Sequence, residues 1–352
     1  MMPGMRIIKR QEPLGWRSCL VLLVAIGFSL ALGGGLLLVR GVDPVAAMGT
    51  LFVGAFGSRY GIEDSALKAI PIFLCSLGVA LAFRLRVWNI GAEGQYALGA
   101  IGASWLPVAM PDLPAYLLLP SMITMAVVAG GMWGAIPAFF RQKMRTNEII
   151  VTLMMNYIAI SLLDYMVYGP WKDPASYGFP MTATFPPAAV VGKIGTTAYS
   201  WGLVHAFVLA VLIWVFTTYT RLGYEIKVGG ANVRAARYAG IPYDRLVIGV
   251  MFLSGALAGW AGFLEASSTL NRLQPSIMAN YGYTAIVVAW LARLNPFYIA
   301  VASFLLAGLR VGVESLQLDM QVPAAFGLII EGLVLLSVLA GGFFTTYRVT
   351  RR

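Results

Sequence analysis

Charged side chains are scarce in this sequence. Only 11% of its 352 residues are Asp, Glu, Lys or Arg, whereas 59% are hydrophobic and the mean hydropathy is +0.78. Soluble domains carry about 25% charged residues, so the composition excludes a soluble globular protein. No hydrophilic stretch is long enough for a separate soluble domain. We therefore predict one all-α integral membrane domain over residues 1–352, with almost no soluble surface on which its net charge of +10 could bind a nucleic acid.

Cysteine and histidine are rare as well. Cys19 and Cys75 both lie in apolar runs, and His205 is the single histidine. These counts exclude a disulfide framework and a metal site built on histidines. The sequence also lacks a nucleophile–base pair and a Gly-x4-Gly-Lys-[Ser/Thr] phosphate loop. We expect the chain to contain no catalytic residue, no metal ion and no nucleotide-binding site of this type.

Apolar stretches of membrane-spanning length are abundant. A spanning helix needs about 20 mainly apolar residues, and about ten stretches approach that length. They cover residues 19–39, 67–85, 90–108, 116–140, 148–168, 201–219, 246–268, 283–293, 297–316 and 324–344. The eighth is the shortest, and Asn295-Pro296 follows it. Either it starts earlier in the chain, or it is a broken helix beside a cavity.

The basic residues predict the orientation of these spans, because cytoplasmic loops are enriched in Lys and Arg. With the N-terminus inside, 18 of the 25 basic residues fall on the cytoplasmic side and seven outside. The inner set comprises Arg6, Lys9, Arg10, Arg17, Arg84, Arg86, Arg141, Lys143, Arg145, Arg221, Lys227, Arg234, Arg237, Arg245, Arg293, Arg348, Arg351 and Arg352. Both termini are therefore expected in the cytoplasm. The long segment 169–200, rich in proline, glycine and aromatic residues, is expected to be an ordered external loop.

The segment Trp88–Gln95 places a carboxylate, amides and glycines at the start of an apolar run. A carboxylate is costly in hydrocarbon, so Glu93 is expected to face protein, water or a ligand. Gly91 and Gly94 allow another backbone or a solute to approach closely. Asn89 and Glu93 are four residues apart, and we expect them to share one face of a helix.

Other polar residues lie within or beside the spans. Each either lines a transport path or is a hydrogen-bond partner of a neighbouring helix. Amides and carboxylates bind hydroxyl groups, and aromatic rings stack on bases, so such residues suit a neutral solute rich in hydroxyls. The candidate path residues are Trp88, Asn89, Glu93, Gln95, Asn156, Glu265 and Asn271.

The cytoplasmic loop 220–245 contains a short helix signal. Asn232 can cap a helix, Gly240 can end it, and Pro242 follows. A helix of about two turns is marginal alone in water, so it needs a partner surface. An ordinary basic loop is the alternative. The residues expected to form a docking surface for a cytoplasmic protein are Gly223, Gly229, Gly230, Asn232, Arg234, Ala235, Ala236, Gly240 and Ile241.

Four segments resemble a known family. Trp88–Gln95 is similar to the Asn-Ile-Gly-Ala-Glu-Gly-Gln signature of permease subunits of nucleoside and simple-sugar ABC importers, which belong to the branched-chain amino acid/ribose-type permeases. Arg145–Ile158 resembles a second signature, and the loop 220–242 resembles the coupling segment. Tyr281–Leu291 resembles a fourth stretch, in which Phe and often Asp-Gly are usual where this chain has Tyr283, Thr284 and Ala285. These departures bear on the substrate more than on the family.

The resemblance implies the larger type of ABC importer permease, in which helices 2–5 and 7–10 form repeats of opposite topology. It also implies an ATPase subunit that binds ATP and Mg²⁺, a second permease that forms a heterodimer with this chain, and an extracytoplasmic binding protein. Membrane lipid surrounds such a subunit, and the location is the bacterial or archaeal inner membrane. An ion-coupled secondary transporter is the rival function, because Glu93, Asp164, Glu265 and Glu331 could serve ion coupling.

Overall fold

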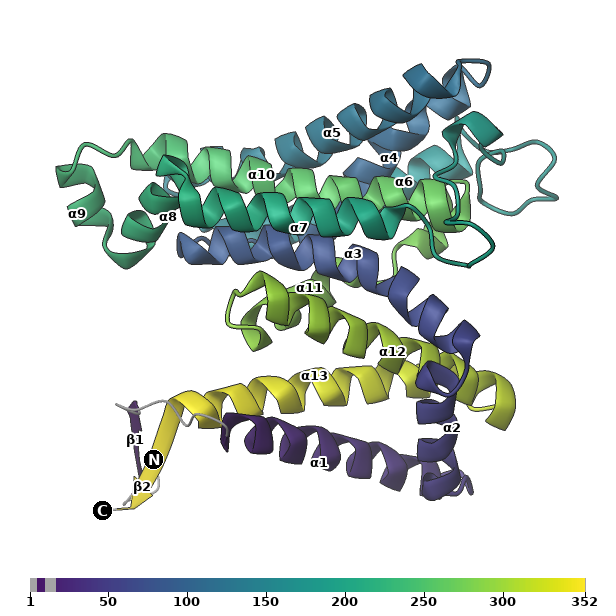
Figure 1. Ribbon diagram of the computed structural model, residues 1–352, viewed down its shortest axis with the longest axis horizontal. Helices are drawn as coiled ribbons and strands as arrows, with labels where there is room; N and C mark the ends of the chain where they lie inside the picture. The colour runs from purple at the N-terminus through teal and green to yellow at the C-terminus, as the bar shows by residue number, and fades with distance from the viewer. Residues whose placement is uncertain (1–4, 10–16, 352) are drawn as a thin grey trace. The chain divides into compact units, whose positions relative to one another are not determined.

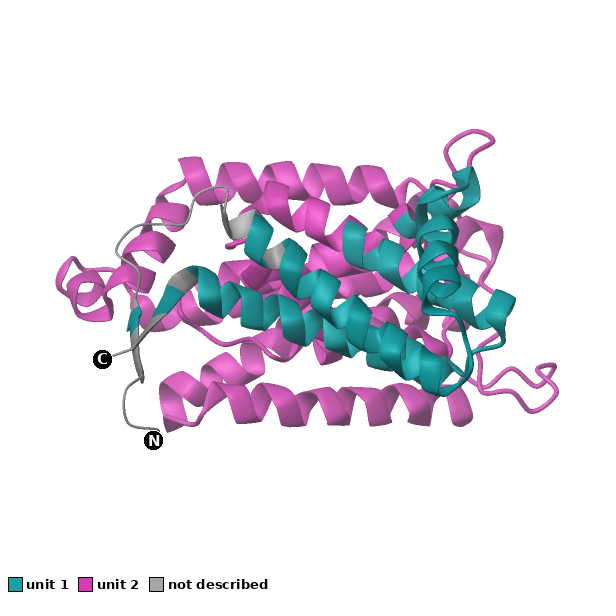
Figure 2. Ribbon diagram, turned by 90° about the horizontal axis from the view of Figure 1, so that it is seen from below, with its two compact units in different colours: residues 1–65, 305–352 teal, residues 66–304 magenta. Residues whose placement is uncertain are grey.

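The computed structural model describes residues 5–9 and 17–351, which form two compact units. Residues 66–304 make up the larger unit, and residues 1–65 together with 305–352 make up the smaller one (Figure 2). Helices α3 (Arg59–Arg84) and α12 (Pro296–Met320) each begin in one unit and end in the other.

The smaller unit is built on two long apolar helices. α1 (Arg17–Val39) packs along α13 (Ala324–Thr346), and strands β1 (Met5–Lys9) and β2 (Tyr347–Arg351) pair antiparallel, with Met5 opposite Arg351 (Figure 1). α2 (Pro44–Phe56) begins where Asp43 accepts a hydrogen bond from the Val45 N–H, with Pro44 in its first turn. The core of this unit comprises Leu37, Ala47, Val313, Leu316, Val322 and Ile330.

An ion pair joins α12 to α13 within the smaller unit. Arg310 Nη2 lies 2.7 Å from Glu331 Oε1, and its Nε lies 3.0 Å from the same oxygen. Both side chains are largely shielded. Glu331 thus has a cationic partner, which is how a carboxylate in an apolar helix is normally accommodated.

The larger unit contains the helices that hold the polar motifs. After α3 come α4 (Ala92–Ala109), α5 (Ala115–Met144), α6 (Glu148–Tyr168), α7 (Gly202–Tyr219), α8 (Arg221–Ala231), α9 (Val233–Tyr238), α10 (Tyr243–Leu264) and α11 (Tyr281–Leu291). Short helical turns lie at Pro187–Ala189, Glu265–Leu270 and Pro275–Ile277. The loop expected after residue 168 therefore contains one such turn.

Glycines bring α4, α5 and α10 close together. A Cβ added to Gly99 would overlap the backbone of Gly259, and one added to Gly130 would overlap the backbone of Gly255 and Gly259. Small residues four apart let helix backbones approach in a membrane, and Gly255 and Gly259 have this spacing. Beside these helices, the middle of α3 is almost completely buried, from Ile72 to Ala82.

Each expected span coincides with a helix, but their lengths differ. Seven described helices are long and apolar enough to cross a membrane: Arg59–Arg84, Ala115–Met144, Glu148–Tyr168, Gly202–Tyr219, Tyr243–Leu270, Pro296–Met320 and Ala324–Thr345. The protein is therefore a multi-pass membrane protein. The expected count of about ten spans would also require α1, α4 and α11. α11 begins at Tyr281, two residues before the expected start of the eighth span, yet it has only 11 residues.

Candidate transport site and coupling surface

The turn before α4 is held by an interlocked pair of amides. Asn89 Nδ2 donates to Gln95 Oε1 at 2.9 Å and to Ser254 Oγ at 2.8 Å. Asn89 Oδ1 accepts from Gln95 Nε2 and from the Gly91 N–H, both at 3.0 Å. Because α4 begins only at Ala92, Asn89 lies in a turn, and the expectation that it shares a helix face with Glu93 is wrong. The hydrogen bond from the Gly91 N–H to the side chain of Asn89, two residues earlier, favours that turn over a helix.

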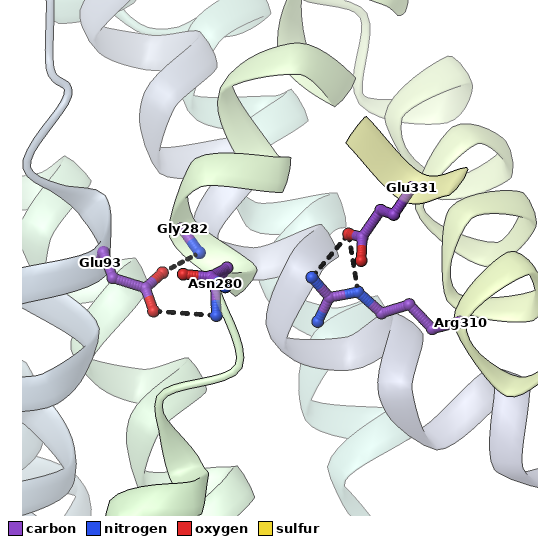
Figure 3. A network of polar contacts seen from close by, with 5 residues as sticks. All are labelled: Glu93, Asn280, Gly282, Arg310 and Glu331. Carbon is purple, nitrogen blue, oxygen red and sulfur yellow. Dashed lines mark hydrogen bonds and ion pairs between the residues drawn. The ribbon is translucent and has the colours of Figure 1, made fainter. Parts of the chain in front are cut away.

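The carboxylate of Glu93 binds the start of α11 (Figure 3). Its Oε1 accepts the Asn280 N–H at 3.1 Å, and its Oε2 accepts the Gly282 N–H at 2.6 Å. Glu93 is only 1% exposed. The first N–H groups of a helix have no partner within the helix and carry partial positive charge, so they are suitable donors for a buried carboxylate. Glu93 therefore connects α4 to α11.

Asn156 connects α6 to both of these segments. Its Nδ2 donates to the Ile90 carbonyl at 2.9 Å and to Tyr283 Oη at 3.1 Å, and its Oδ1 accepts the Gly94 N–H at 2.9 Å. A Cβ at position 94 would lie 2.9 Å from this oxygen, so a glycine is needed there. Residues of two motifs that are distant in the sequence thus gather with Ser254 of α10 in one buried polar network, defined here as Asn89, Glu93, Gln95, Asn156 and Ser254. A third motif, Tyr281–Leu291, contacts this network through the backbone N–H of Gly282 and the hydroxyl of Tyr283.

An aromatic surface lies next to this network. Trp88, which precedes Asn89, stacks on Trp290 of α11 with ring centroids 5.6 Å apart and an interplanar angle of 26°. Phe83 contacts both indoles, at 5.1 Å and 5.8 Å. Trp88 is 41% exposed and Trp290 is 48% exposed. Of the candidate path residues near α4, Trp88 is therefore the exposed one, whereas Asn89, Glu93 and Gln95 are buried.

Sequence reasoning did not include Tyr283 and Trp290 among the path residues. Along Tyr281–Trp290, the positions that are not fully buried are Tyr283, Ile286 and Trp290. Their spacing of three and four residues marks one helix face. The same spacing is readable in the sequence, but only the fold brings Trp290 to Trp88.

Glu265 and Asn271 lie elsewhere. Glu265 begins the π-helical turn at the end of α10, and Asn271 follows that turn. Glu265 is about 16 Å along the helix from Ser254. Thr269 Oγ1 donates to Glu265 Oε2 at 3.4 Å. Asn271 has a left-handed backbone, and its buried Oδ1 has no hydrogen-bond partner among the described residues. If these two residues contact a solute, they do so at a different level of the bundle.

The loop 220–245 folds into two short helices. α9 begins after Asn232, whose Oδ1 accepts the N–H groups of Arg234 at 2.9 Å and Ala235 at 3.2 Å. It ends before Gly240, which has a φ of +78°. The Ile241 N–H then donates to the Ala236 carbonyl at 3.0 Å. The short helix expected from Asn232 to Ala239 is present, whereas α8 was not expected as a separate helix.

Each of the two helices presents a different surface. On α8, a Cβ added to Gly230 would overlap the Arg84 carbonyl, and Gly229 faces the Leu85 side chain, so this helix packs on the end of α3. Thr220 caps α8 by accepting the Gly223 N–H at 3.1 Å. On α9, Ala236 is buried, but Arg234 and Ala235 are exposed and Tyr238 is 96% exposed. α8 is therefore anchored to the membrane helices while α9 offers a free face.

Nothing in the described part of the chain indicates a metal centre, because it contains no group of three or more His, Cys, Asp and Glu residues that could hold an ion.

Comparison with known proteins identifies the family of the chain. Residues 61–339 match the model of the family described as the branched-chain amino acid transport system / permease component.

Three curated relatives cover nearly the whole chain. A glucose ABC transporter permease protein of Haloferax volcanii is 38% identical over 331 residues, which is 91% of this chain and 87% of the relative. A guanosine ABC transporter permease protein of Bacillus subtilis is 32% identical, covering 91% and 92%. A nucleoside ABC transporter permease protein of Lactococcus lactis subsp. cremoris is 30% identical, covering 86% of each chain. The chain therefore belongs to the family of branched-chain amino acid transport system permease components, which are transport subunits rather than enzymes.

Proposed function

We propose that this chain is the membrane permease subunit of an ABC importer and forms the path for a nucleoside or a related sugar-containing solute. The names of the relatives include guanosine, nucleoside and glucose. The observation that carries the proposal is the half-exposed Trp88–Trp290 stack beside the buried polar network. An exposed indole face binds a base or a sugar ring by stacking, and rigid supports keep it in position.

The partners follow from what the chain lacks and from the free face of α9. ATP and Mg²⁺ bind to a separate ATPase subunit, which receives α9 in a groove. A second, homologous permease completes a heterodimer, and an extracytoplasmic protein delivers the solute. We further propose about ten spans with inverted repeats, a bacterial or archaeal inner membrane, and cytoplasmic termini, as the 18 inner basic residues favour.

An ion-coupled secondary transporter fits the contacts less well. Such a mechanism needs a carboxylate that can exchange an ion near the middle of the membrane. In this chain Glu93 binds two backbone N–H groups and Glu331 is paired with Arg310. Neither contact would remain intact if the carboxylate took up and released a cation in each cycle.

The test is uptake by proteoliposomes that contain this chain with its ATPase, second permease and binding protein. Labelled guanosine should enter only when ATP reaches the ATPase, and ionophores should leave the rate unchanged. Excess unlabelled nucleoside should compete, and glucose should be compared in parallel. Uptake that proceeds without ATP and collapses with an ionophore would establish the secondary transporter instead.

A further inference from the structure

A groove of about 800 Å³ follows the length of α7 within the larger unit. Its α7 wall is one stripe of side chains that recur every three or four residues, from Leu203 to Thr218. These two residues are 15 positions apart, so the stripe is about 22 Å long. α3 and the first turns of α12 form the other walls. The groove is thus elongated along a membrane helix.

The two ends of the groove differ in chemistry. Most of the lining is apolar, including Phe73, Phe207 and Phe304. At one end lie Arg84, Thr218 and Asn295. Among the described residues that line the groove, Arg84 is the one that carries a charge. A long apolar channel with a cationic and hydrogen-bonding end has the polarity of a single phospholipid.

The guanidinium of Arg84 has more N–H donors than its one hydrogen bond to the Leu294 carbonyl uses. Its Nη2 donates to the Leu294 carbonyl at 2.8 Å, which fixes its position. No carboxylate within the described ranges pairs with it, although a guanidinium has five N–H donors. A cation inside a membrane protein normally has a partner of opposite charge. An anionic oxygen at this end of the groove would supply that partner.

We propose that the groove is a binding site for one anionic phospholipid. An acyl chain lies along the α7 stripe, and the phosphate accepts hydrogen bonds from Arg84, with Thr218 and Asn295 beside it. Arginine binds phosphate through two parallel N–H groups, and basic pockets between membrane helices select anionic headgroups. Under the topology proposed above, this end faces the cytoplasmic leaflet, but the binding site itself does not depend on transport.

Two other occupants fit less well. A zwitterionic lipid would fill the apolar part, but its own cationic group would reduce the attraction to Arg84. A helix from a second permease would also cover the apolar lining and would leave the guanidinium without an anion unless it brought a carboxylate. The charge at the groove end therefore favours the anionic lipid.

Trp214 lines the groove and reports on its contents. We would place the purified permease in phosphatidylcholine nanodiscs with a small fraction of brominated phosphatidylglycerol or brominated phosphatidylcholine, because bromine quenches nearby indoles. The chain has nine tryptophans, so the Trp214 signal is taken as wild type minus Trp214→Phe. Brominated phosphatidylglycerol should quench Trp214 at a mole fraction about fivefold lower than brominated phosphatidylcholine does. This ratio corresponds to the ~1 kcal/mol that one basic residue contributes to binding an anionic headgroup.

Matched variants locate the selectivity. Arg84→Gln should abolish the preference for the anionic lipid, whereas Arg86→Gln should retain it, because Arg86 is exposed and does not line the groove. Equal quenching by both lipids in the wild type would mean ordinary annular lipid, and no quenching by either would mean that protein covers the groove. Either result overturns the proposal.

A second measurement needs no variant. Native mass spectrometry of the wild-type permease, after delipidation and exposure to an equal mixture of the two lipids, should retain one phosphatidylglycerol. Retention of both in equal amounts, or of none, contradicts the site even if Arg84→Gln does not fold. Since neither measurement involves a solute or ATP, their failure leaves the importer proposal untouched, and failed guanosine uptake leaves the lipid site untouched.

Discussion

Glu93 makes hydrogen bonds to residues that follow it by 187 and 189 positions in the chain. In Glu93→Gln, one carboxylate oxygen becomes an NH₂ group that faces an N–H donor of α11. A buried donor without an acceptor costs about 1–3 kcal/mol. We expect membrane insertion to persist, the melting temperature in detergent to fall, and transport to be impaired.

Asp164→Asn is the control, since Asp164 also lies in an apolar helix but takes no part in the polar network. Melting can be followed by size-exclusion chromatography of heated samples. A Glu93→Gln protein that melts and transports like the wild type would show that the contact with α11 is dispensable.

Trp290 tests the aromatic surface. Stacking of a base on an aromatic ring is worth about 1–3 kcal/mol, so Trp290→Ala should raise the KM of nucleoside uptake roughly tenfold, and Trp290→Phe should raise it less. Trp105→Ala is the matched control, because Trp105 is also exposed but lies about 18 Å along α4 from Glu93. An equal loss in both alanine variants would remove stacking as the explanation.

Sequence reasoning identified four members of the buried network, Asn89, Glu93, Gln95 and Asn156, but neither Ser254 nor the geometry of the network. The types and local spacing of Asn89, Glu93 and Gln95 distinguished them from an ordinary apolar span. Their partners Gly282 and Ser254 lie far along the chain, and nothing local indicates such contacts. Trp290 lies in the recognised stretch Tyr281–Leu291 but was not placed among the path residues for the same reason, since its partner Trp88 is 202 residues away.

At the scale of elements, α9 was predictable because its signals are local. Asn232 caps it and Gly240 ends it, as the residue types require. α2 was missed although Asp43 and Pro44 mark its start, because its 13 residues are too few for a span. The lesson is that caps define short helices here better than apolar length does.

The structure also shows which residue of α9 should be altered to test docking. Ala236 is buried in its own chain, whereas Ala235 is exposed. Ala235→Trp should therefore fold and insert normally, yet weaken binding to the ATPase and abolish stimulation of hydrolysis by the solute. Co-purification and ATPase assays measure both effects.

Ala175→Trp is the control for that experiment, since Ala175 is exposed in the loop 169–200 and takes no part in α8 or α9. The control should keep the ATPase bound and stimulated. Normal coupling in the Ala235→Trp protein would rule out docking through this face of α9.

At the scale of the whole molecule, the distribution of basic residues predicts that the loop 169–200 is external and that α9 is cytoplasmic. Tyr177 is 99% exposed in the loop 169–200, and Tyr238 is 96% exposed at the end of α9. In a background without Cys19 and Cys75, Tyr177→Cys should react with an impermeant maleimide in intact cells, and Tyr238→Cys should react only after lysis. Labelling of position 238 from outside would reverse the proposed topology.

The contact between Glu93 and α11 has a consequence for the order of assembly. A ribosome adds about 5–20 residues per second, so roughly 10–40 s separate the synthesis of Glu93 from that of Asn280. During this interval the two donors on α11 do not yet exist, although α4 has already been made. During synthesis, the carboxylate on α4 therefore lacks these two donors until the last fifth of the chain has been made. The contact between α4 and α11 therefore forms late in synthesis. Chains that stop before residue 280 would lack it and would be targets for membrane quality control.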